Sequence, residues 1–313
     1  MEKIVYMKTD ISEIYSSRIM NNINDSFYVA NISWEGRIKS LRTYAEIIVR
    51  FILNIPEEHL LISRKIQELK TISDNNELLM SSVNVICEYG DEYVHTEIAD
   101  QATESDFNKM VDAIYGLYAY LFIAFFEKYN YKNNRSLYMF SLLPPIIRYK
   151  TFNYLWNNDK KNPILIDKLN LAILKTFGYE VAKEWIDDNK ELLMNLSSKS
   201  KEYMEEMTVK FGDLSSKLLE AGPQNMYEVC IEKLNTLKNP IEKYGPLYNT
   251  YEEALSTYNK QMLEIQSRKE FCMEEIELKS IMDFCFQGRK GKVNVKDSAK
   301  YSLAELRVLQ KTC

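Results

Sequence analysis

The chain has 313 residues, of which 46% are hydrophobic and 27% charged, a balance that excludes an intrinsically disordered protein. Only 9 Gly and 7 Pro are present, so the composition favours long helices over short strands joined by tight turns. The formal net charge of −5 excludes a general attraction to nucleic acid, so any anion-binding surface must be local. The five cysteines are far apart, which argues against a zinc site or a disulfide framework and is typical of a reducing, cytoplasmic location.

Residues 1–134 are predicted to form a four-helix bundle that follows an irregular start. The first long helix covers residues 27–54 and is closed by Pro56. One face of this helix is predicted from the three-and-four spacing of its apolar residues, which are Ile38, Leu41, Ala45, Ile48 and Ile52. The second and third helices cover residues 59–72 and 77–89.

The fourth helix begins at a capping signal, because Thr103 precedes Asp106 by three residues, and it continues to Tyr131. Its apolar stretch, residues 111–126, is shorter than the ~20 residues that span a bilayer and carries an acidic side chain, Asp112. We therefore interpret it as the central helix of a bundle, and no membrane contact is expected.

The rest of the chain is predicted to be helical as well, which makes the fold class all-α. Residues 135–189 form a small block rich in aromatic side chains, with three short helices punctuated by prolines. Residues 190–287 alternate charged and apolar positions without a heptad sustained over three or four repeats. This pattern favours a long antiparallel, coiled-coil-like hairpin over a parallel zipper. Residues 288–313 form a basic C-terminal tail.

One of the two histidines, His95, stands in the run VICEYGDEYVHTE. This run resembles a segment of HEPN domains of the branch attached to bacterial restriction and defence proteins, which reads roughly Ile-Arg-x-x-Gly-Asn-x-x-x-His. Ile86, Gly90 and His95 match it directly, and Asp91 takes the place of Asn. The resemblance covers about residues 25–130, including the helix order, and implies a four-helix bundle with a dimer surface.

The departure from this pattern lies at Cys87, where catalytic members of the family have Arg. In those ribonucleases, the resemblance implies, Arg and His from two protomers converge and cut RNA without a metal, with the 2′-hydroxyl as nucleophile. A neutral thiol cannot replace a permanently charged guanidinium that binds phosphate through two donors, and Asp91 would add negative charge beside the phosphate. Arg42 or Arg50 on the first helix are the candidates to replace the missing cation.

Three functions stay open from the sequence. The first is a non-catalytic interaction or regulatory subunit, in which Gly90 is a left-handed helix cap and His95 binds a neighbouring loop. The second is an active endoribonuclease that uses His95 as acid and base and Arg42 as the cation. The setting expected for both, a bacterial or phage-borne defence or nucleic-acid-processing assembly with a protein partner or a second copy, follows from the resemblance alone.

The third function is a nucleic-acid-binding adaptor that acts through the basic tail. A flexible cationic arm can contact phosphates without sequence specificity. The candidate anion-binding residues of this arm are Arg289, Lys290, Lys292, Lys296 and Lys300. Neither a metal nor a cofactor is expected, because the chain has no Gly-rich phosphate loop and no His-Glu-x-x-His or Asp-x-Asp spacing.

Overall fold

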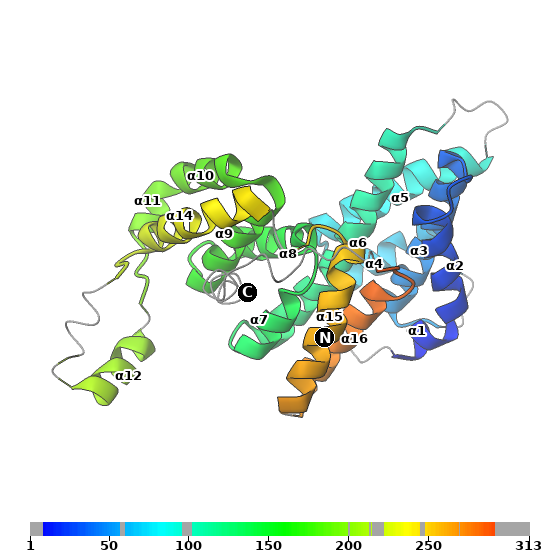
Figure 1. Cartoon of the computed structure of the whole chain (residues 1–313). Coiled ribbons are helices and arrows are strands. Elements are labelled where there is room, and N and C mark those ends of the chain that lie inside the picture. The colour runs from blue at the N-terminus through cyan, green and yellow to red at the C-terminus, as the bar shows by residue number, and fades with distance from the viewer. Residues whose placement is uncertain are drawn as a thin grey trace. The chain divides into compact units, whose positions relative to one another are not determined.

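The computed structural model of the chain describes residues 9–56, 60–95, 102–199, 201–212, 214, 222–244, 248–268 and 270–291; the side chains of residues 9, 91–95, 201–203, 242–244 and 268 lie outside this description. Apart from one isolated bridge between Ser197 and Asn225, the regular secondary structure of this part is helical, which confirms the all-α class. The chain divides into two compact units (Figure 1). The first comprises residues 1–151 and 250–293, and the second residues 152–249 and 294–313.

The prediction of an irregular start is wrong for residues 9–27, which are mostly helical. Helices α1 (Thr9–Ile14) and α2 (Ser16–Phe27) precede α3 (Trp34–Leu53), and α2 packs against α3. The predicted first helix therefore starts later than expected, at the N-cap Ser33, whose side chain accepts a hydrogen bond from the Gly36 amide. The α2–α3 turn is held by Arg37, which donates to the backbone oxygens of Ser26 and Val29, both at 2.7 Å.

The predicted apolar face of α3 is confirmed, because each of its five members is buried: Ile38, Leu41, Ala45, Ile48 and Ile52. The short turn η1 (Ile62–Lys65) and helix α4 (Ile66–Ile72) come next, followed by α5 (Glu77–His95) and α6 (Glu104–Tyr129). The last two pack against each other and against α3. The capping box at the start of α6 is also confirmed, since the Asp106 amide donates to Thr103 Oγ1 and the Thr103 amide donates to Asp106 Oδ2.

Helix α6 is the central helix of the first unit. It is long and apolar enough to cross a membrane by length and composition, but 72% of its most apolar window is buried inside the protein. Its contacts with α3, α5 and α16 account for its apolar character without a bilayer.

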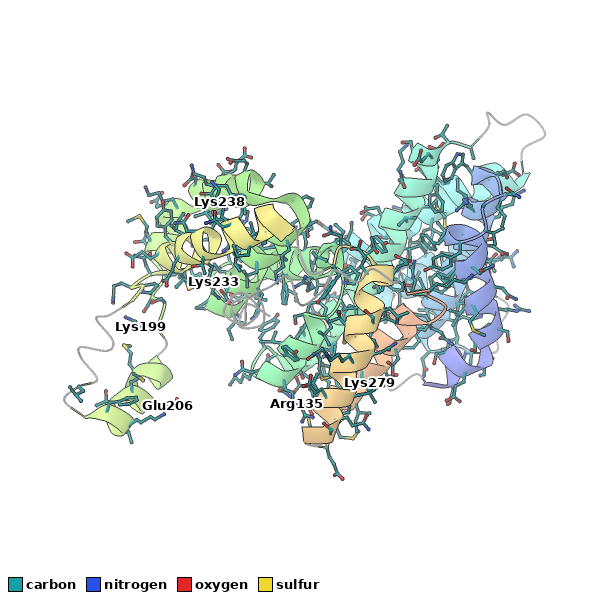
Figure 2. The ribbon with its side chains drawn as sticks, viewed as in Figure 1. Arg135, Lys199, Glu206, Lys233, Lys238 and Lys279 are labelled. Carbon is teal, nitrogen blue, oxygen red and sulfur yellow. The ribbon has the colours of Figure 1, made fainter. Side chains whose placement is uncertain are left out.

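The first unit is completed by helices from distant parts of the sequence, α7 (Asn134–Phe140), α15 (Tyr251–Arg268) and α16 (Met273–Phe286). Figure 1 shows α15 and α16 side by side, where Tyr258 stacks on Phe286 with ring centroids 4.2 Å apart. Arg135 of α7, labelled in Figure 2, pairs with Glu275 of α16 at 3.1 Å. Residues 190–287 are thus not one hairpin, because their last two helices belong to the first unit.

The second unit is built around α9 (Pro163–Phe177), α10 (Tyr179–Asp188) and α14 (Met226–Tyr244), which pack on one another. Helix α8 (Pro145–Asn158) leads into it from the first unit, and α11 (Lys190–Met194) and α12 (Lys201–Phe211) complete it. Lys233 of α14, labelled in Figure 2, forms an ion pair with Asp167 of α9. The predicted boundaries after residues 134 and 189 are not observed, because α7 packs with the first unit and α10 and α11 with α14.

Candidate functional site

The sequence motif lies on α5, and Gly90 has a different role there from the one predicted. Helix α5 continues without interruption to His95, so Gly90 is an interior helical residue and not a left-handed cap. A Cβ atom added at Gly90 would lie 2.2 Å from Cδ of Arg42 and 2.9 Å from its Cγ. The missing side chain therefore allows the arginine stem of α3 to cross directly over the backbone of α5.

Arg42 is consequently part of the α3–α5 contact. Its residue surface is 8% exposed, and its Nη1 lies 3.2 Å from the Oε1 of Glu46, one turn further along the same helix. Arg50 is equally buried, with its guanidinium 5.2 Å from the centroid of the Tyr15 ring. Both candidates for the missing cation are therefore buried in the first unit.

The other motif residues follow α5 at helical spacing. Ile86 is fully buried, while Cys87, in the place of the family arginine, is half-buried. The backbones of Asp91 and His95 are helical, and their side chains lie outside the described residues. At ~1.5 Å rise per residue, Cys87 and His95 are separated by roughly 12 Å along the helix axis. A thiol–imidazole pair within one chain is excluded by this separation.

A groove of about 800 Å³ lies between α5 and α6 beside the motif, with Lys150 of α8 at its edge. Its two lysines have acidic or phenolic partners. Lys109 Nζ is 2.7 Å from the Tyr89 hydroxyl and 3.5 Å from Asp106, and the hydrogen bond to Tyr89 raises the pKa of Lys109. Lys150 pairs with Asp112 at 2.9 Å. The lining also carries three carboxylates, from Glu88, Glu104 and Asp112, so the groove lacks the concentrated positive field that phosphate binding requires.

The start of the predicted anion-binding tail is corrected by the structure, because Arg289 is a core residue. It is 7% exposed, its guanidinium carbon lies 4.3 Å and 4.8 Å from the ring centroids of Phe27 and Tyr251, and its Nη1 is 3.5 Å from Glu252. Burial alone would lower the pKa of Arg289, but nearby phenols and Glu252 raise it overall. Arg289 thus stays a permanent cation and forms a buried cluster with Phe27, Tyr251 and Glu252, the Arg289 cluster.

The residues around Arg289 tie the end of α16 to α2. The Tyr28 hydroxyl donates to Glu252 Oε1 at 2.6 Å and accepts from the Lys290 amide at 3.0 Å. Lys290 itself is exposed, and its ammonium group contacts Asn24 and lies 5.0 Å from the centroid of the Tyr28 ring. The remaining predicted tail residues, Lys292, Lys296 and Lys300, lie outside the described residues.

Sequence reasoning missed Arg289 because it appeared in a run of basic residues after the last helix. The available signal was its position three residues after the apolar end of α16, IMDFCF, and its aromatic partners, Phe27 and Tyr251, come from distant parts of the chain. In the part of the chain that the structure describes, no group of three or more His, Cys, Asp or Glu side chains is placed to hold a metal. No family model, curated protein or solved structure matches the chain.

Proposed function

We propose that the protein is a non-catalytic, HEPN-like interaction subunit that assembles with protein in a bacterial or phage-borne defence or nucleic-acid-processing system. The setting and the cytoplasmic location rest on the resemblance of residues 25–130 and on cysteine usage. The absence of a catalytic role rests on the residues themselves.

One observation carries the proposal: both arginines that could replace the family cation, Arg42 and Arg50, are buried in the first unit. Arg42 is buried over Gly90 and ion-paired with Glu46. Moving it into a groove would open the α3–α5 contact and break its ion pair with Glu46. Together with a neutral thiol at Cys87, this leaves no committed phosphate-binding cation at the motif.

The neighbouring groove supports the same proposal. Lys109 and Lys150 are the basic residues of its lining, and both have partners within the first unit. Phosphoryl chemistry needs positive groups that are free to meet charge that develops in the transition state. An active ribonuclease would have to break these pairs each time it bound RNA.

The test is incubation of the purified full chain with total RNA, beside the His95→Ala variant. We expect no cleavage by either protein and no RNA fragments with 2′,3′-cyclic phosphate ends. Cleavage that yields such ends and disappears in His95→Ala would overturn the proposal and establish the ribonuclease. A catalytically intact arginine-containing HEPN ribonuclease run under the same conditions shows that the assay detects the product.

A further inference from the structure

Arg148 of α8 is a buried cation without a counter-charge. The residue is 5% exposed, and its Nε is buried without a hydrogen-bond partner. Among the residues that the structure describes, no ion pair, hydrogen bond or aromatic ring contact is found for its guanidinium. The other buried arginines in this part of the chain each have an acidic or aromatic partner: Arg42, Arg50 and Arg289. Arg148 is the exception that requires an explanation.

A buried charge without a partner strongly destabilises a folded protein, so such charges are almost always paired. The acidic residue that pairs with α8, Asp112, is bound by Lys150 at 2.9 Å and not by Arg148. A polar group that a native fold leaves buried and unsatisfied points to an ion or another bound group that completes the site. For a guanidinium, this group must be an anion.

The start of α8 adds a second source of positive charge. The helix begins at Pro145, which has no amide hydrogen, and its first turn holds no acidic residue. The Ile147 amide donates to the Pro144 oxygen at 3.1 Å, and no acceptor is found for the Ile146 amide in the described part of the chain. Because long side chains of a helix lean back over the preceding turn, Arg148 at the fourth position is directed toward this uncapped end.

These two kinds of donor favour a phosphate group over a carboxylate. The guanidinium is a planar fork whose N–H groups bind two oxygens of one anion. A carboxylate has only these two oxygens, whereas a phosphate group has further oxygens that can accept from the amide of a helix start. An anion next to so buried a residue would also be shielded from water, which strengthens its hydrogen bonds.

We propose that Arg148 and the first turn of α8 bind a phosphate group, either as inorganic phosphate or as the phosphate of a small ester. The bound group neutralises Arg148 and thereby stabilises the first unit. This site uses none of the motif residues on α5, so it goes beyond the proposed interaction role and does not depend on it.

Binding to the full chain is measured by isothermal titration calorimetry at constant ionic strength, with inorganic phosphate, AMP, adenosine and acetate as probes. We expect acetate to bind at least tenfold more weakly than phosphate and adenosine not to bind. Tighter binding of AMP than of inorganic phosphate would identify an ester as the source of the phosphate group, and equal or weaker binding would identify the free anion.

A matched pair of variants separates this site from the general effect of charge. Arg148→Met keeps an apolar stem and removes the cation, while Arg64→Met removes the same charge from an exposed arginine of η1. Arg148→Met should weaken phosphate binding at least tenfold, and Arg64→Met should leave it unchanged. Absent phosphate binding, equal binding of acetate, or equal loss in both variants would overturn the proposal.

Urea denaturation gives an independent readout that also shows whether the variant folds. Without phosphate, Arg148→Met should unfold at the same or a higher urea concentration than wild type, because it removes an unpaired buried charge. Phosphate should raise the midpoint of wild type and leave that of Arg148→Met unchanged, since a ligand stabilises only a protein that binds it. A lower midpoint of Arg148→Met without phosphate would show that Arg148 already has a partner in the free protein, and the proposal would fall.

Discussion

The first unit buries charged side chains, whereas α12 of the second unit exposes apolar ones. Arg289, Glu275 and Glu277 are each less than a tenth exposed, and α12 presents Val209 and Phe211 to solvent. Burial of a charge is tolerated where specific partners stabilise it, and single apolar side chains are common on protein surfaces. The first unit therefore uses charged residues inside its core, whereas α12 carries apolar residues that contribute little buried surface.

The largest expected effect tests whether the buried side chain of Arg289 stabilises the first unit. Arg289→Met keeps the apolar stem but leaves the Glu252 carboxylate, whose side chain is 14% exposed, without its cation. Removing one partner of a buried ion pair costs about 3–5 kcal/mol. We expect a loss of that order in the free energy of unfolding, measured by urea denaturation followed by circular dichroism.

The double variant Arg289→Met/Glu252→Gln is the control, because it removes both charges together. It should recover most of the lost stability, since replacing a whole buried pair by neutral groups is often close to neutral in free energy. A single variant as stable as the wild type would show that Arg289 contributes no stabilisation, and the tail assignment would have to be revisited.

A second expected effect concerns the α3–α5 contact. In an ordinary helix Gly→Ala gains about 0.5–1 kcal/mol. At Gly90 the new methyl group would lie 2.2 Å from Arg42 Cδ, so we expect Gly90→Ala to destabilise the protein by about 1–3 kcal/mol. Urea denaturation measures the change.

The Arg42→Ala background tests the cause of this loss. With the arginine stem removed, the same Gly90→Ala substitution should become stabilising by about 0.5–1 kcal/mol. If the sign of the Gly90→Ala effect were the same in both backgrounds, Arg42 would not be what the glycine accommodates.

The sequence predicted the parts of this fold that local patterns control. The apolar face of α3 and the Thr103–Asp106 capping box are set by residues three and four positions apart, and both are confirmed. The sequence did not predict contacts between residues that are far apart in the chain. Arg289 contacts Phe27, more than half of the chain away, and α15 and α16 belong to the first unit. Gly90 was misread for the same reason, because its role is set by Arg42 on another helix and not by its neighbours in sequence.

A third effect is the acid dependence of the Arg289 cluster. Burial raises the pKa of Glu252, but the hydrogen bond from Tyr28 and the charge of Arg289 bring it below its ordinary value of 4.5. A carboxyl group whose folded pKa is lowered contributes stability above its unfolded pKa, and this stability is lost as the pH falls through the folded value. Between neutral pH and acid below the ordinary value, wild type should therefore lose more stability than Glu252→Gln in urea denaturation. Equal losses would show that Glu252 does not couple folding to pH.

The smallest expected change in the free energy of unfolding is for a substitution on α12, the exposed side of the comparison. Phe211 is exposed, so Phe211→Ala should alter the free energy of unfolding by less than about 0.5 kcal/mol, the usual range for surface substitutions. Val209→Ala on the other side of the helix is the matched control and should behave alike in urea denaturation. A large loss of stability in Phe211→Ala alone would mean that the Phe211 ring is covered within the chain, and α12 would then resemble the buried core of the first unit rather than an exposed helix.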